Sequence, residues 1–264
     1  MEPRWLDDLE RWFDTYTGQF FGQDEYVNMH LRLKQEHTRR TREEVLYLAG
    51  RLALDDNQTR IAETVALLHD IGRFPQFATY RTFNDGRSVN HCSLGVEVLC
   101  RERVLETLSL EERQWIETAI AYHGRKSLPA GLEGPALLFL KLIRDADKLD
   151  IYRIVADVYR RQAEDPTGFS FEIELPDEPR ITPAVLDAVL TGRLIEHTSL
   201  QTLNDFRLCQ IGWVYDINFT ASLERLKIGG WLNELFGYLP QNDQTDRVRE
   251  RIFRYVESRL TTMP

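Results

Sequence analysis

Histidine and aspartate residues recur along the first two-thirds of the chain in an order that suits metal binding. Each member of the set falls on, or at the end of, a stretch with helical periodicity. In chain order the set is His37, His69, Asp70, His91, His123 and Asp147. Imidazole nitrogens and carboxylate oxygens are common protein ligands of divalent metal ions. The sequence therefore predicts a metal site assembled from several segments.

The surroundings of these residues strengthen the prediction. They lie among Leu, Ile, Val and Ala, and a buried ionisable side chain is costly unless it has a partner. A lone histidine on an apolar face is usually an ordinary core residue, and a single His-Asp pair often occurs by chance. Chance explains the complete ordered set much less well, because one metal centre between helices would satisfy all of its members together.

Amphipathic helices are the elements that must position this set. Steps of three and four predict one long helix from Asp24 to Leu54. Its inner face is expected to carry Tyr26, His30, Leu33, His37, Thr41, Val45, Leu48 and Leu52. Later helices are expected over Asn57–His69 with Gly72 as the stop, through Leu94–Leu105, from the Ser109/Glu112 capping box to Gly124, and over Ala136–Ala163.

Two aspartates in the last of these helices compete to be the final ligand. Asp145 and Asp147 are two residues apart, so their side chains point about 200° from each other on a helix. Only one of them can face the metal. Helix geometry leaves both open as the ligand. If Asp147 is the ligand, the Asp145 carboxylate is a candidate to orient a ligand imidazole.

Composition and charge indicate which binding partners and which cellular compartment are expected. The chain has 264 residues with 33 Lys and Arg against 42 Asp and Glu, a formal charge of −9, which disfavours binding to a nucleic acid polymer. Three cysteines without paired spacing indicate a reducing compartment. The chain shows neither a signal-peptide core nor an apolar run near the roughly 18 residues that span a bilayer. We therefore expect a cytoplasmic protein without membrane contact; its oligomeric state is open.

The pattern of residue types along the sequence changes beyond Asp165. Residues 1–165 are predicted to form a helical metal-binding core, and residues 166–264 an extension packed on that core. Alternation over Phe169–Leu175 predicts a short strand or hairpin arm, and helices resume at Pro183. The predicted fold class is all-α, a helical bundle with a mostly helical C-terminal extension.

From roughly Asp24 to Arg161, the ordered set resembles the HD superfamily of metal-dependent phosphohydrolases. The segments His69-Asp-Ile-Gly-Arg-Phe74 and Asp145-Ala-Asp-Lys-Leu-Asp150 are especially similar to small bacterial HD proteins. The family pattern ends in Ala-Asp-x-Leu, which favours Asp147 over Asp145.

The resemblance implies a ligand assignment. His37, His69, Asp70 and Asp147 would bind one metal ion. His91 and His123 would be the extra ligands of two-metal members, with Asp70 bridging the two ions. The cofactor would be one or two divalent ions, drawn from Mn, Fe, Mg, Ni or Zn.

The resemblance also implies hydrolysis of a small anionic substrate that contains phosphate. A phosphomonoester or phosphodiester fits, a nucleotide among them. A divalent ion lowers the pKa of bound water and supplies hydroxide near neutral pH, and Asp70 would position that hydroxide.

Four basic residues are candidates for contacts with the substrate. Arg73, one turn past His69, is predicted to bind phosphate through its guanidinium; the alternative is a charge facing the helix dipole. Arg125 and Lys126 follow His123 and are further substrate-binding candidates, unless they are ordinary loop surface. Lys148, beside Asp147, is predicted either to neutralise a leaving group or to pair with the acidic neighbours of Arg144.

Two other functions share this pattern. HD-fold di-iron oxygenases carry a similar residue set and cleave C–C or C–P bonds with dioxygen. A regulatory protein could bind metal or nucleotide without catalysis. Bound iron with oxygen consumption would favour the first, and tight ligand binding without turnover would favour the second.

Overall fold

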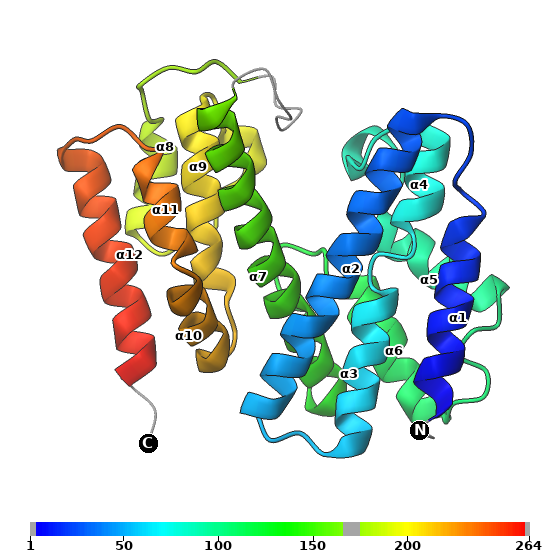
Figure 1. The fold of residues 1–264 in the computed structure, drawn as a ribbon. Helices are drawn as coiled ribbons and strands as arrows, with labels where there is room; N and C mark the ends of the chain where they lie inside the picture. Colours follow the sequence, from blue (N-terminus) through cyan, green and yellow to red (C-terminus); the bar gives the residue numbers. More distant parts are fainter. Residues whose placement is uncertain (1–3, 166–174, 262–264) are drawn as a thin grey trace. The chain divides into compact units, whose positions relative to one another are not determined.

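The computed structural model describes residues 4–165 and 175–261, and all of their regular structure is helical (Figure 1). Twelve α-helices and three short 3-10 helices account for it, and no strand occurs within these ranges. The all-α prediction is confirmed. The strand predicted over Phe169–Leu175 lies, apart from Leu175, outside the described residues.

The chain forms two compact units, residues 1–147 and 148–264. The division falls inside helix α7 (Gly134–Glu164), earlier in the chain than the boundary expected after residue 165. The second half of this helix therefore groups with the C-terminal helices. That residues 166–264 pack as an extension on the core stays a prediction.

The first unit is built around helix α3, which packs against α1, α2 and α6. Helices α4 and α5 also pack on each other. The elements of this unit are α1 (Arg4–Gly18), α2 (Glu25–Arg51), α3 (Asp56–Leu68), α4 (Arg73–Tyr80), η1 (Asp85–Arg87), α5 (His91–Arg101), α6 (Leu110–Tyr122) and the start of α7. Helix α4 was not expected from the sequence.

Local capping explains where these helices begin. The predicted Ser109/Glu112 capping box is present at α6, and Asp55 with Gln58 forms another at α3. The Asn90 side chain accepts a hydrogen bond from the Ser93 amide at 2.9 Å and so starts α5 at the next residue. Each cap fixes the register in which a helix presents its histidine.

The inner face of α2 differs in part from the expected one. His37, Thr41, Val45 and Leu48 are buried, whereas Tyr26 and Leu33 are 44% and 43% exposed. At about 100° per residue, Tyr26 and Leu33 fall on one edge of the predicted stripe, whereas His30 between them points closer to its centre and is buried.

The second unit contains the rest of α7 and the C-terminal helices. These are α8 (Pro183–Leu190), η2 (His197–Ser199), α9 (Leu203–Gly212), η3 (Trp213–Asp216), α10 (Thr220–Gly229), α11 (Trp231–Gly237) and α12 (Asp243–Thr261). The fully buried carboxylate of Asp205 accepts hydrogen bonds from the Thr182 amide at 2.7 Å and the Thr182 hydroxyl at 2.6 Å. This contact ties the starts of α8 and α9 together.

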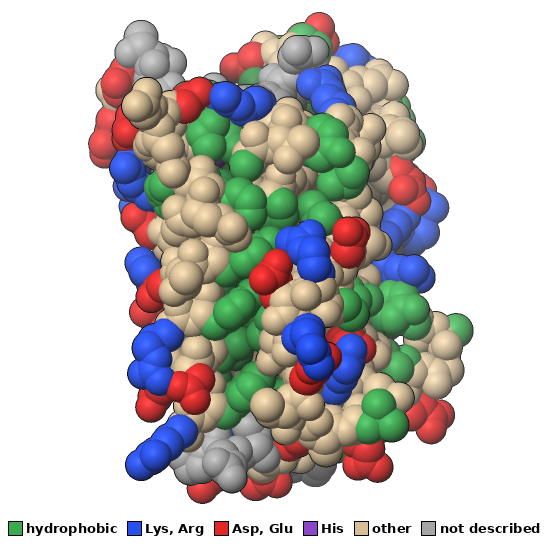
Figure 2. All heavy atoms as spheres, turned by 90° about the vertical axis from the view of Figure 1, so that its right-hand side faces the viewer, with side chains coloured by type: hydrophobic (Ala, Val, Ile, Leu, Met, Phe, Trp, Pro, Cys, Tyr) green, Lys and Arg blue, Asp and Glu red, His purple; other side chains and the backbone are tan. Residues whose placement is uncertain are grey.

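Acidic and basic side chains are interspersed on the face drawn in Figure 2, without a large area of one sign. Within residues 4–165 and 175–261, no helix combines the length and apolar character that crossing a bilayer would need.

Gly72 is required by a close approach of two helices and does not act as the predicted stop of a helix. Helix α3 ends at Leu68, and Gly72 stands before α4 with an ordinary φ of −66°. A Cβ at this position would lie 2.2 Å from the His91 carbonyl oxygen and 2.6 Å from the Gly95 nitrogen. The start of α5 can therefore reach Asp70 only because residue 72 has no side chain.

Replacing Gly72 with alanine is expected to destabilise the protein by about 1–3 kcal/mol or more, because backbone must shift to admit the methyl group. Urea unfolding measures the change. Gly50→Ala is the matched control, since a Cβ there meets nothing within 4 Å, and it should be neutral or slightly stabilising. Equal effects of the two substitutions would contradict this role for Gly72.

Candidate metal centre

The predicted ligands come together inside the first unit. His37 lies in the middle of α2, His69 and Asp70 follow the end of α3, His91 begins α5, His123 follows α6, and Asp147 lies on α7. All are buried except Asp147, whose side chain is 21% exposed. Three helix ends, one of which carries both His69 and Asp70, and two helix interiors thus contribute to one cluster.

Asp70 stands at the centre of this cluster and faces a pair of histidines with each oxygen. Its Oδ2 lies 3.7 Å from His37 Nε2 and 3.8 Å from His69 Nε2. Its Oδ1 lies 3.6 Å from His91 Nε2 and 3.7 Å from His123 Nε2. The cluster therefore has two halves that share one carboxylate.

Hydrogen bonds on the far side of the rings orient three of the four histidines. The Nδ1 atoms of His69 and His123 donate to the carbonyl oxygens of Ala66 at 2.7 Å and Ile120 at 2.8 Å. His91 Nδ1 donates to Asp85 Oδ2 at 2.7 Å. Because these acceptors carry no proton, each neutral ring keeps a lone pair on Nε2, which is the form that binds metals.

Imidazole nitrogens also meet within each half of the cluster. Nε2 of His91 lies 3.2 Å from Nε2 of His123, and Nε2 of His69 lies 3.4 Å from Nε2 of His37. With both rings neutral, the two Nε2 atoms of the His91–His123 pair have no hydrogen to share, and they are open to a proton or a metal ion or, for His91, to the neighbouring Cys92 thiol. Two nitrogens bound at about 2.1 Å to one tetrahedral ion are roughly 3.4 Å apart. The residues present therefore fit a metal in each half.

The pKa values of two histidines bear on which rings are neutral and able to bind a metal ion. Burial lowers the pKa of His69 to about 4, which keeps this ring neutral and ready to bind. Burial also opposes charge on His123, but nearby Asp70 and Cys92 outweigh it and raise the pKa of His123 to about 10. A metal ion entering that half would displace a proton.

Two cations hold Asp70 in its ionised form. Lys34 Nζ lies 2.7 Å from Oδ2, and Arg73 Nε lies 3.5 Å from Oδ1. Burial opposes ionisation, but Lys34, the neighbouring imidazoles and Arg73 keep the pKa of Asp70 well below its usual range. The carboxylate is thus charged and able to bridge.

Asp85 connects the loop before α5 to the centre. Its Oδ2 accepts from His91, and its Oδ1 lies 2.8 Å from Arg73 Nη1. The Gln76 amide donates to the same Oδ1 at 2.9 Å. Burial opposes ionisation, yet the contacts with His91, Arg73 and Gln76 lower the pKa of Asp85 to about 2. A carboxylate behind a ligand imidazole fixes the ring and increases its basicity.

The two candidate aspartates occupy different places. Asp147 Oδ1 lies 3.1 Å from His37 Nε2, so Asp147 joins the cluster. Asp145 is fully buried, and its supporting role stays a prediction. The neighbouring Arg144 donates to the carbonyl oxygens of His123 at 2.9 Å and Lys126 at 3.3 Å, and also to that of Arg125. It thereby fixes the turn that carries His123.

The basic candidates are placed in different ways. Arg73 Nη1 donates to the Phe83 carbonyl at 2.6 Å as well as to Asp85, so one arm of its guanidinium holds the loop. Arg125 and Lys126 are exposed, and the Arg125 guanidinium lies 4.3 Å from the centre of the Tyr122 ring. Lys148 belongs to the second unit and pairs with Asp216 at 2.7 Å. Their predicted contacts with substrate stay predictions.

Sequence reasoning missed Lys34, Asp85 and the contact of Cys92 with the histidines. Lys34 stands three residues before His37 on the same helix, which is a spacing that brings side chains together. Asp85 lies in a polar loop with no periodic pattern, so only the folded chain reveals its contact with His91. Cys92 was expected to be a buried thiol, but its Sγ lies 3.3 Å from His91 Nε2.

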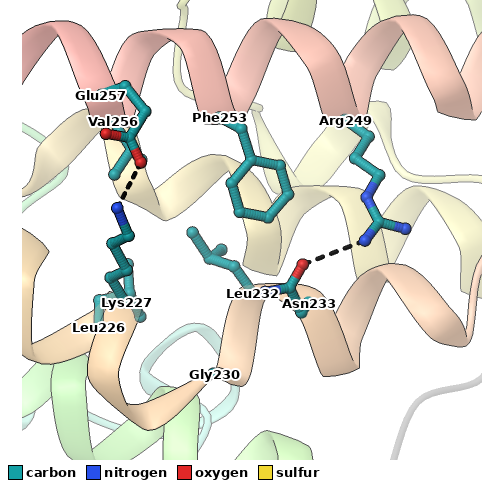
Figure 3. A pocket seen from close by; sticks show the side chains of 9 residues that line it. All are labelled: Leu226, Lys227, Gly230, Leu232, Asn233, Arg249, Phe253, Val256 and Glu257. Atoms are coloured by element: carbon teal, nitrogen blue, oxygen red, sulfur yellow. Dashed lines mark hydrogen bonds and ion pairs between the residues drawn. The ribbon is translucent and has the colours of Figure 1, made fainter.

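The second unit contains a pocket of about 290 Å³ between α12 and the α10–α11 segment (Figure 3). Leu226, Leu232, Phe253 and Val256 contribute apolar surface to it. Lys227 pairs with Glu257 at 2.6 Å, and Arg249 donates to Asn233 at 3.1 Å. The described residues lining it include no histidine, cysteine or aspartate, in contrast to the buried cluster.

Replacing Asp85 with alanine is expected to weaken metal binding by roughly 10–100-fold, because His91 loses the carboxylate that orients it. Competition with a chromophoric chelator measures the affinity. Asp56→Asn, an exposed aspartate at the start of α3, is the control and should leave it unchanged. Wild-type affinity in the Asp85 variant would show that the contact does not support the centre.

Asp85 should also make folding stability depend on pH. Its pKa is about 2 in the folded protein against about 3.9 when unfolded, so its contribution is present above about pH 4 and is lost as the pH falls towards 2. In metal-free protein, the difference in unfolding free energy between wild type and Asp85→Asn should shrink over this range. A difference that stays constant with pH would contradict the assignment.

Comparison with known proteins is consistent with this geometry. Residues 36–152 match the family model described as HD domain. No match was found among curated proteins or among solved structures. The matched range begins one residue before His37 and includes every residue of the cluster except Lys34. Residues 36–152 of this chain are therefore an HD domain.

Proposed function

We propose that the protein is a metal-dependent phosphohydrolase that cleaves a small phosphomonoester or phosphodiester. The observation that carries the proposal is the shared carboxylate, because Asp70 presents one oxygen to each pair of histidines. HD domains belong mostly to metal-dependent phosphohydrolases, and the His and Asp groups here are able to hold metal.

The charge of the site supports an anionic substrate. Lys34 and Arg73 contribute two positive charges, and Asp70, Asp85 and Asp147 contribute three negative ones, which leaves −1 when the imidazoles are neutral. One divalent ion changes this to +1 and two ions change it to +3. A centre loaded with metal would therefore attract phosphate, although the whole chain carries −9.

The residues have separable tasks in this proposal. A bound divalent ion would supply hydroxide near neutral pH and polarise phosphate oxygens. His37, His69 and Asp147 would hold one ion with Asp70, and His91 and His123 the other. Lys34 is 21% and Arg73 16% exposed in their side chains, so both can present N–H groups to phosphate oxygens while they contact Asp70.

Asp70→Asn is expected to lose metal and phosphatase activity together. The loss of activity should exceed about 100-fold, which is more than a supporting residue contributes. Metal analysis of the purified protein and assays with p-nitrophenyl phosphate, its bis ester, nucleotides and cyclic dinucleotides provide the readouts. Asp56→Asn should retain both properties.

Other outcomes would contradict the proposed hydrolysis or favour another function. Full metal content in Asp70→Asn would refute the bridging role. Bound iron together with oxygen consumption, and no phosphate release, would replace hydrolysis with oxygenation. Tight binding of nucleotide or phosphate without turnover would favour a regulatory protein.

A further inference from the structure

Cys92 lies against the half of the centre that contains His91 and His123. Its Sγ is 3.3 Å from His91 Nε2 and 3.6 Å from His123 Nδ1, and the residue is 2% exposed. The three side chains offer ligand atoms that all lie within 4.8 Å of one another. No corresponding sulfur is found among the residues of the His37–His69 half.

The 3.3 Å distance between Cys92 Sγ and His91 Nε2 suits two ligands of one ion. A thiolate bound at about 2.3 Å and an imidazole bound at about 2.1 Å are roughly 3.6 Å apart at a tetrahedral angle. The His91 and His123 nitrogens already face each other at 3.2 Å with Asp70 Oδ1 at 3.6 and 3.7 Å. Sulfur would complete a set of four donors.

Backbone packing keeps the sulfur in this position. A Cβ on Gly124 would lie 2.9 Å from Cys92 Sγ and 3.1 Å from His91 Cε1. The turn after His123 therefore leaves space only for a residue without a side chain. Cys209, which is also buried, has no histidine in contact among the described residues, and burial raises the pKa of its thiol to about 11.

We propose that Cys92 supplies a sulfur ligand to the metal ion held between His91 and His123. The inference rests on the proposed metal-dependent function and makes the two halves of the centre chemically different. On binding, the S–H bond breaks, the sulfur forms a bond to the metal, and the proton passes to the buffer. No electron is transferred. The sulfur half selects thiophilic ions such as zinc, cobalt or iron over manganese and magnesium.

Cobalt(II) titration of the metal-free full-length protein tests the assignment by absorption spectroscopy. Wild type should develop a sulfur-to-cobalt charge-transfer band in the near ultraviolet together with visible d–d bands. Cys92→Ser should lose the charge-transfer band entirely and keep visible d–d bands from the remaining donors. Cys100→Ser and Cys209→Ser are matched controls and should keep both sets of bands.

Each result has a definite meaning. Visible cobalt bands without a charge-transfer band in wild type, or a band that persists in Cys92→Ser, would overturn the sulfur ligand and leave the metal centre standing. No cobalt binding at all would overturn both this inference and the proposed function. If Cys92→Ser fails to fold, X-ray absorption of the wild-type zinc protein replaces it. A sulfur neighbour at about 2.3 Å supports the proposal, and a first shell of nitrogen and oxygen alone contradicts it.

Discussion

A buried carboxylate between two pairs of imidazoles is the constraint on which the rest of this HD domain depends. Asp70 is 3% exposed, and a charge so far from water is costly without compensation. Lys34 and Arg73 compensate it directly, and the imidazole nitrogens of each half face one another where a cation could bind. The polar interior is therefore able to hold an ion, and removal of a single partner would leave other buried groups unsatisfied.

The helices are placed to meet this requirement. Four of the six groups in the cluster stand at helix ends, where short turns direct side chains inward. The approach of α5 to the turn after Asp70 depends on the absence of a side chain at Gly72. Behind the rings, carbonyl oxygens of Ala66 and Ile120 and the carboxylate of Asp85 decide which nitrogen carries the proton. Hydrogen bonds of the fold thus determine which imidazole nitrogens are available to a metal ion.

Much of this arrangement could be predicted from the sequence, and the remainder has identifiable physical reasons. Helical periodicity and the capping box at Ser109 located the helices of the first unit other than α1 and α4, and the order of His and Asp residues pointed to one centre. The family resemblance favoured Asp147 as a member of that centre. Asp85 escaped notice because a loop has no period that relates it to His91. Tyr26 and Leu33 were expected inside but are exposed, since steps of three and four define a broad stripe and do not show which of its edges meets a neighbouring helix. The pairing of Lys148 with Asp216 joins residues far apart in sequence, and no local pattern identifies the partner.

The most direct test of the central claim is to locate the metals themselves. Crystals grown with manganese allow an anomalous difference map to be calculated in the region of Asp70. The account predicts two peaks roughly 3.5–4 Å apart, one beside Oδ1 with His91 and His123, and one beside Oδ2 with His37 and His69. If manganese binds poorly in the half that contains Cys92, zinc should give the second peak. A single peak under both conditions, or peaks that do not contact Asp70, would contradict the account.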